Sequence, residues 1–152
     1  ATLKSLVEQF PSDKTWGLKD PRALFMLKGW NQVITPKLIG TFRHPNETVA
    51  SLIFRSKAWN KPMTESLAFN LWGAYNERLL KAYEETPFDI IRYDIPTDEY
   101  HKKVNSAANK LGLQASNIFT FREESLHNQQ RKVDAIPDHL IKTWERLNAI
   151  AI

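Results

Sequence analysis

The stretch that decides the fold is "LIGTFRHPNETVASLIFR", residues 38–55, in which an apolar run, a basic pair, a turn and a helical pattern follow one another. The segment 37–43 predicts a buried strand, because it is apolar in the middle and ends on the charged Arg43. The following residues predict a helix with Asn46 as its N-cap and Glu47 in its first turn. A strand followed at once by a helix is the unit of parallel α/β sheets.

Two other segments have the same character. "TWGLKD" (15–20) and "FDIIRYD" (88–94) are apolar in the middle, end in charged residues and precede helix-like sequence. Strands that alternate with helices predict parallel βαβ units with right-handed crossovers. We therefore expect an α/β fold with a three-layer arrangement, a parallel sheet flanked by helices. Three strands are few for such a sheet, so we expect further sequence on the amino-terminal side to complete it.

Helical patterns with recognisable start signals fill the remaining intervals. The expected helices are one capped by Asp20 with Pro21 first, a long one after Thr64, one capped by Thr97 that stops at Gly112, and one from Pro137. In the long helix, apolar residues recur at helical spacing, which predicts a core-facing stripe of Leu67, Leu71, Tyr75, Leu79 and Tyr83. The polar stretch 113–135 is expected to be a loop with short elements.

The composition limits the class of protein. The chain has 152 residues, 42% of them hydrophobic and 25% charged, which fits a single domain over residues 1–152. There are no cysteines, which excludes disulfides and thiolate sites and fits a cytoplasmic protein. No apolar run approaches membrane-spanning length, and the start "ATLKSLVEQF" lacks the pattern of a signal peptide. The net charge of +4 is compatible with an anionic partner, but the basic residues form no cluster, which disfavours nucleic acid.

The carboxyl ends of the expected strands carry the candidate site, because ligands of parallel sheets bind at that edge. The polar residues expected there are Lys19 and Asp20, Arg43 and His44, and Tyr93 and Asp94. Arg43 would leave its strand where a helix begins, and helix amino termini favour anions. Ser51 and Arg55 are four residues apart on that helix, so a hydroxyl and two guanidinium groups could together bind a phosphate. The alternative left open is that Arg43 pairs with Glu47, while Ser51 is a packing residue and Arg55 is solvated.

Lys19 lies at the corresponding end of the first expected strand. An ammonium group there could stabilise charge that develops on a transferred group. A salt bridge between Lys19 and Asp20 is an equally good explanation from spacing alone. Asp20 itself is better explained as a helix cap than as a base.

Taken in order, these segments resemble the sulfotransferases that use 3′-phosphoadenosine 5′-phosphosulfate (PAPS), over about residues 15–112. "WGLKDPR" (16–22) resembles the lysine-bearing strand of that family, and "FRHPNETVASLIFR" (42–55) resembles its 3′-phosphate-binding segment. "IIRYDIP" (90–96) is similar to the strand and turn that place a tyrosine near the adenine. "LWGAYNERLL" (71–80) resembles a core helix of the family.

The resemblance implies a P-loop-type sulfotransferase fold and transfer of a sulfuryl group to a hydroxyl or amine. It implies that PAPS, or its product adenosine 3′,5′-bisphosphate, is bound through its 3′-phosphate by Arg43, Ser51 and Arg55, and lies near Tyr93. Lys19 would be the catalytic residue that stabilises the transferring group. The acceptor and the oligomeric state do not follow from the resemblance.

The chain departs from the family pattern in two places. The 5′-phosphosulfate loop and the segment that supplies the catalytic base are not recognisable, and both precede the lysine strand in the family. The chain is therefore expected to correspond to the latter part of such an enzyme. Arg131 and Lys132 are candidates for the last cofactor contacts, without a glycine-rich signature to support them.

Other functions remain as alternatives or are disfavoured. A sulfotransferase-like module that binds a nucleotide or nucleic acid without catalysis is the main alternative, and an interaction domain without a site is a third. The four histidines lack metal-type spacing, so no metal site is expected. No G-x-S-x-G or complete G-x-x-x-x-G-K-[ST] motif is present, which disfavours a hydrolase and a self-contained NTPase.

Overall fold

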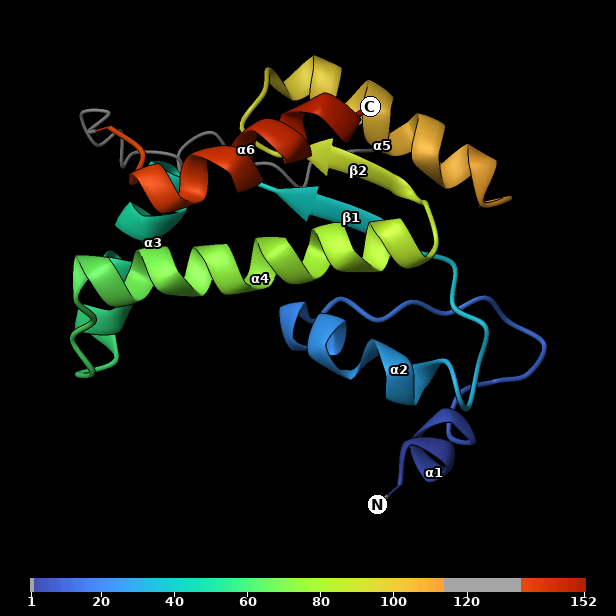
Figure 1. Cartoon of the computed structure of the whole chain (residues 1–152). Helices are drawn as coiled ribbons and strands as arrows, with labels where there is room; N and C mark the ends of the chain where they lie inside the picture. Colours follow the sequence, from blue (N-terminus) through green and yellow to red (C-terminus); the bar gives the residue numbers. More distant parts are fainter. Residues whose placement is uncertain (1, 114–134) are drawn as a thin grey trace. The chain divides into compact units, whose positions relative to one another are not determined.

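The protein is mixed α/β and mostly helical, with a small parallel sheet of two strands (Figure 1). The computed structural model describes residues 2–113 and 135–152. Their contacts divide the chain into two compact units, Ala1–Leu38 and Ile39–Ile152. The expected loop at 113–135 lies almost wholly outside the described residues.

The first unit contains three short helices, which are α1 (Leu3–Val7), the 3-10 helix η1 (Pro21–Met26) and α2 (Leu27–Trp30). Asp20 caps η1 as predicted, because its side chain accepts a hydrogen bond from the Arg22 N–H and Pro21 occupies the first helical position. The 3-10 form was not anticipated by the sequence pattern.

The predicted strand at 15–20 is wrong, because this segment forms no regular element. A strand is stable when a neighbour satisfies its backbone groups and one face is buried. Here Leu18 is 53% exposed, and Lys19 is exposed as well. Trp16 instead stacks on Phe10, with ring centres 4.2 Å apart.

The second unit contains the sheet. Its elements in chain order are β1 (Ile39–Phe42), α3 (Pro45–Ala58), α4 (Glu65–Glu85), β2 (Asp89–Arg92), α5 (Thr97–Lys110) and α6 (Asp138–Ile150). The two strands are parallel, with Ile39 opposite Asp89 and Phe42 opposite Arg92. The predictions of strands at 37–43 and 88–94 and of their parallel pairing are thus confirmed.

Strand β2 is buried on both faces. Ile90 and Ile91 are both fully buried, although successive residues of a strand point to opposite faces. Ile91 packs in a cluster with Tyr100 and Ala107 of α5. On the other face, Leu79 of α4 packs closely on Gly40 of β1, because an added Cβ at Gly40 would lie only 3.0 Å from Cδ1 of Leu79. Figure 1 shows α4 and α5 on opposite sides of the two strands.

Helix α4 buries only part of the expected stripe, together with residues on a neighbouring face. Leu79 is buried, but Leu67 is 50% exposed. The buried residues are Ala68, Phe69, Trp72, Gly73, Asn76, Leu79, Leu80 and Ala82. Small residues on this face allow close packing against α6, since an added Cβ at Gly73 would lie 2.8 Å from Cδ2 of Leu140. The boundaries were predicted correctly, with Thr64 as the N-cap.

Two of the predicted caps are wrong by one or two residues. His44, not Asn46, is the N-cap of α3, because Pro45 takes the first helical position and the Nδ1 atom of His44 accepts the Asn46 N–H. Pro96, not Thr97, is the N-cap of α5. The predicted stop at Gly112 is confirmed, since its φ of 79° lies in the left-handed region that ends helices.

The end of the chain closes the second unit against β2. After α6, the backbone N–H of Ile152 donates a hydrogen bond to the carbonyl oxygen of Ile90 at 3.0 Å. Ile152 also packs against the cluster that contains Ile91. Within the described residues, no helix has the length and apolar character needed to cross a bilayer.

Candidate anion-binding site at the carboxyl ends of the strands

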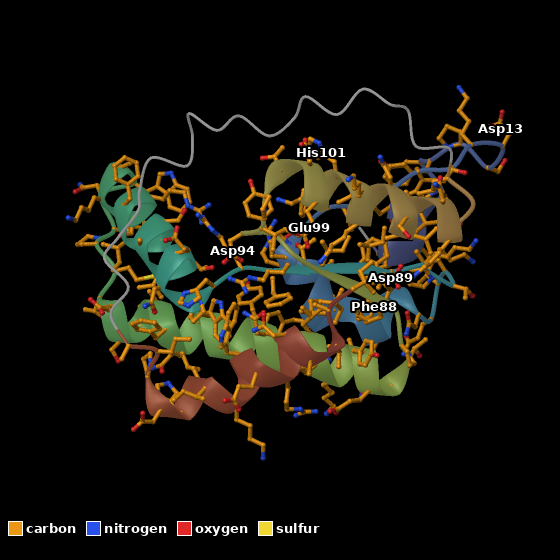
Figure 2. The ribbon with its side chains drawn as sticks, turned by 90° about the horizontal axis from the view of Figure 1, so that it is seen from above. Asp13, Phe88, Asp89, Asp94, Glu99 and His101 are labelled. Atoms are coloured by element: carbon orange, nitrogen blue, oxygen red, sulfur yellow. The ribbon has the colours of Figure 1, made fainter. Side chains whose placement is uncertain are left out.

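The carboxyl ends of β1 and β2 bring four of the expected polar residues together, namely Arg43, His44, Tyr93 and Asp94. The Tyr93 N–H donates to the Phe42 carbonyl at 2.8 Å, which continues the ladder past both strand ends. The guanidinium carbon of Arg43 lies 5.8 Å from the centre of the Tyr93 ring. Figure 2 shows Asp89 and Asp94 at opposite ends of β2, with Asp94 marking the carboxyl end.

The backbone of Arg43 is fixed by a hydrogen bond, whereas the donors of its guanidinium group are only partly hydrogen-bonded. Its carbonyl oxygen accepts a hydrogen bond from Nε1 of the buried Trp72 at 2.9 Å. Its Nη2 donates to Oε2 of Glu47 at 2.9 Å, and both side chains are about one-quarter exposed, at 25% and 23%. Its Nε atom is buried and has no hydrogen-bond partner among the described residues. A buried, unpaired guanidinium donor is costly and favours a further acceptor.

A second set of contacts fixes the turn that follows β1. The His44 N–H donates to Oδ1 of Asp94 at 3.1 Å, and Asp94 is paired with Arg92 at 2.8 Å. The Arg92 guanidinium lies over the Trp144 ring, 4.7 Å from its centre, and the His44 ring meets Trp144 edge-on at 4.8 Å. Residues from β2, from the turn after it and from α6 therefore hold the amino terminus of α3 in place.

This arrangement is not a catalytic His–Asp pair. Asp94 accepts the backbone N–H of His44, not an imidazole N–H, and the Nδ1 atom of His44 is occupied by the Asn46 N–H. Burial lowers the pKa of His44 from its usual 6.5, although the Asp94 carboxylate opposes this shift. Burial alone would raise the pKa of Asp94, but hydrogen bonds from Arg92 and from the His44 N–H lower it overall.

We expect stability to fall as the pH drops below about 6.5 because of His44. The folded state disfavours the protonated imidazole, so the pKa of His44 is lower in the folded protein than in the unfolded chain, where it is about 6.5. At pH values between these two pKa values the unfolded chain binds more protons than the folded protein, and the free energy of unfolding therefore falls as the pH is lowered. His44→Asn keeps a capping acceptor and should remove this component. Urea unfolding of both proteins at pH 7.5 and 5.5 measures it. An equal loss of stability in the two proteins would contradict the assignment.

Ser51 and Arg55 lie on the same helix as predicted, and both are on α3. Ser51 is partly buried, and Arg55 is exposed. Arg55 donates from Nε to the Ser51 carbonyl at 3.4 Å and lies 5.9 Å from the centre of the Trp59 ring. Glu47 stands one helical turn before Ser51, so the order along this face is Arg43 paired with Glu47, then Ser51, then Arg55. The alternative in which Arg43 pairs with Glu47 is the one observed.

Lys19 belongs to the first unit and is exposed. Its neighbour Asp20 binds Arg22 through both carboxylate oxygens, at 2.7 Å for the closest pair. This interaction lowers the pKa of Asp20 to about 2. The carboxylate that could have paired with Lys19 is thus held by another side chain.

Two further expectations from the sequence concern other residues. Arg131 and Lys132, the candidates for the last cofactor contacts, lie outside the described residues. In the described part of the chain, no group of three or more histidine, cysteine or acidic side chains could hold a metal ion. Neither family models nor curated proteins nor solved structures gave a match to this chain.

Two residues at this edge were missed by sequence reasoning. Trp144 lies on α6, far along the chain from β1, and nothing in its local sequence links it to Arg43 or His44. Arg92 occupies the last position of β2 and would be expected only to be solvated. The signal that could have found Arg92 is its spacing of two residues from Asp94, which lets both lie on one face of an extended chain.

Proposed function

We propose that this chain carries the 3′-phosphate-binding part of a PAPS-dependent sulfotransferase. The observation that carries the proposal is Arg43, which leaves a parallel strand directly before a helix amino terminus and has a buried Nε without a partner among the described residues. A nucleotide phosphate carries the negative charge that a helix amino terminus favours, and its oxygens can accept a hydrogen bond from the Arg43 Nε–H.

The residues around Arg43 fit a nucleoside phosphate. The positive end of the α3 dipole lies at this helix amino terminus and favours an anion, although Pro45 has no N–H and the Asn46 N–H is already bound by His44. Tyr93 contacts Arg43 and offers a flat apolar surface on which a base could pack. Ser51 and Arg55 extend the polar face of α3, and we assign them as the further phosphate contacts suggested by their spacing.

The proposed reaction transfers the sulfuryl group of PAPS to a hydroxyl or amine acceptor. The bond between sulfur and the bridging phosphate oxygen breaks, a bond from sulfur to the acceptor forms, and adenosine 3′,5′-bisphosphate and a proton are released. In this proposal Lys19 stabilises the negative charge that builds on the bridging oxygen.

The finer fold is part of the same proposal. We assign the two parallel strands and their helices to a larger three-layer sheet of the P-loop-type sulfotransferase kind. Two observations support this assignment. β2 is buried on both faces, as in sheets covered by helices on both sides. β1 pairs only with β2 among the described strands, so its other edge can accept another strand.

Nucleotide titration tests the proposed function directly. The full 152-residue chain is titrated calorimetrically with adenosine 3′,5′-bisphosphate and with adenosine 5′-monophosphate, which lacks the 3′-phosphate. We expect the bisphosphate to bind at least about tenfold more tightly, because a charge-assisted contact to Arg43 is lost with the second ligand. Equal affinities, or no binding of either, would contradict the proposal.

Glu47→Gln is expected to strengthen binding of the bisphosphate by about tenfold. The carboxylate occupies Nη2 of Arg43 and would place a negative charge beside the phosphate, whereas the amide keeps the shape without the charge. The same change should lower stability slightly, by about 0.3–1 kcal/mol, because an acidic residue in the first turn favours the helix. Calorimetric titration measures the affinity for the bisphosphate, and urea unfolding measures the free energy of unfolding. Weaker binding together with unchanged stability would refute this role for Glu47.

A non-catalytic nucleotide-binding module is the second candidate. It is favoured by one observation, namely that Arg43 and Tyr93 are in contact within one unit, whereas Lys19 belongs to the other unit. Transfer from radiolabelled PAPS to a mixture of phenol, sugar and amine acceptors separates the two candidates. Bisphosphate binding without transfer, in a protein extended at its amino-terminal side, would favour the module.

A further inference from the structure

The turn that joins α3 and α4 exposes an unusual amount of apolar surface. We define the α3–α4 corner as residues 54–67. Within it Phe54 is 59% exposed, Trp59 is 66% exposed and Leu67 is 50% exposed. Single exposed apolar residues are common, but three large ones within one helical hairpin mark a surface that contacts something apolar. Figure 1 shows this turn at the end of the α3–α4 hairpin, away from the two strands.

The same corner is basic. It carries Arg55, Lys57 and Lys61 against one acidic residue, Glu65. Lys57 and Lys61 are exposed, and the Arg55 guanidinium lies 5.9 Å from the centre of the Trp59 ring. Aromatic rings and flexible cations are thus interleaved over the end of the hairpin. This combination fits a partner that is apolar inside and negatively charged at its surface.

The backbone of the corner is held by a buried serine. Ser56 is 3% exposed, and its Oγ donates to the Ile53 carbonyl at 2.7 Å and accepts the Met63 N–H at 3.0 Å. Its own carbonyl accepts the Lys61 N–H at 2.9 Å. The turn is therefore fixed on the helix, and its apolar side chains are presented from an ordered backbone. Little ordering entropy remains to be lost when they are buried.

We propose that the α3–α4 corner docks on the surface of an anionic lipid bilayer. Tryptophan and lysine are the side chains that suit the membrane–water interface, because each has an apolar body and a polar end. A second copy of the chain is disfavoured as the occupant, because two identical corners would bring like charges together. This inference rests on residues 54–67 and does not depend on the proposed transfer reaction.

Vesicle co-sedimentation tests the inference with the full chain. We expect binding to vesicles of phosphatidylcholine mixed with phosphatidylglycerol, and much weaker binding to phosphatidylcholine alone. The double variant Lys57→Gln with Lys61→Gln should lose about 30-fold in partitioning, and added salt should have a similar effect. Trp59→Ser with Phe54→Ser should lose at least about tenfold, because the apolar anchors are removed.

A matched control comes from α6. Ile141 is 38% exposed and Lys142 follows it, so Ile141→Ser with Lys142→Gln removes the same kinds of group elsewhere on the second unit. This control should bind vesicles like the unchanged protein. Equal binding to neutral vesicles, or an equal loss in the control, would overturn the inference. So would a concentration-dependent dimer in sedimentation that Trp59→Ser abolishes, since a second copy would then be the occupant.

Discussion

Replacing Arg43 with alanine should weaken binding of adenosine 3′,5′-bisphosphate by about 2–5 kcal/mol, the usual cost of truncating one partner of a buried charge pair. The Arg43 side chain is about one-quarter exposed, its Nη2 pairs with Glu47, and its Nε has no partner among the described residues, so a bound anion would supply the acceptor that Nε lacks. Calorimetric titration of the two proteins measures the loss. Affinity within about twofold of the unchanged protein would remove Arg43 from the site.

Two comparison variants make this result specific. Arg146 also pairs with a carboxylate, that of Glu84, but lies on α6 and has no proposed role in binding. Arg146→Ala should leave the affinity unchanged, so a similar loss in both variants would indicate a general effect of charge. Arg43→Lys retains the charge but not the planar fork of donors. Its affinity for the bisphosphate should lie between that of Arg43→Ala and that of the unchanged protein.

Local patterns predicted the elements that form this site more reliably than the contacts between them. The two apolar runs at 37–43 and 88–94 became parallel strands, because their sequence matches a buried strand in both length and polarity. The run at 15–20 has a similar pattern, yet it forms no strand. Pairing with a neighbour, not the local pattern, decides whether such a segment becomes part of a sheet.

The buried face of α4 shows a second limit of pattern reasoning. Large apolar residues define the expected stripe, but the small residues Ala68 and Gly73 also face the core. Small residues are buried here because α6 approaches closely at Gly73, and that approach depends on a helix much later in the chain. A periodic hydrophobic pattern reports the size and polarity of the residues within one helix. It contains no information about which other helix packs against that helix.

The sequence predicted which polar residues meet at the candidate site and offered the Arg43–Glu47 pair as an alternative, but it did not predict the other contacts that hold these residues. Arg43, His44, Tyr93 and Asp94 do meet at the carboxyl ends of the strands, as the parallel arrangement requires. The partners that hold them there come from elsewhere, since Trp72 binds the Arg43 carbonyl and Trp144 packs on His44. Such contacts join residues far apart in the chain.

The packing of α6 on α4 leads to the largest expected effect on stability. Leu140 is 2% exposed, and its Cδ2 lies against Gly73, where even one added carbon would be only 2.8 Å away. Leu140→Ala should therefore lower the free energy of unfolding by about 2–5 kcal/mol, because glycine has no side chain that could move into the cavity. Urea unfolding followed by tryptophan fluorescence measures the change.

The adjacent residue supplies the control for this prediction. Ile141 is 38% exposed, and Ile141→Ala should change the free energy of unfolding by less than about 0.5–1 kcal/mol. Because Trp144 lies one turn beyond Leu140 on the same helix, loss of the α6 contact should also free Arg92 and His44 from the Trp144 ring. Leu140→Ala should then weaken binding of the bisphosphate, although Leu140 does not touch the proposed site. Equal stabilities for the two variants would show that α6 does not pack on α4 through Leu140.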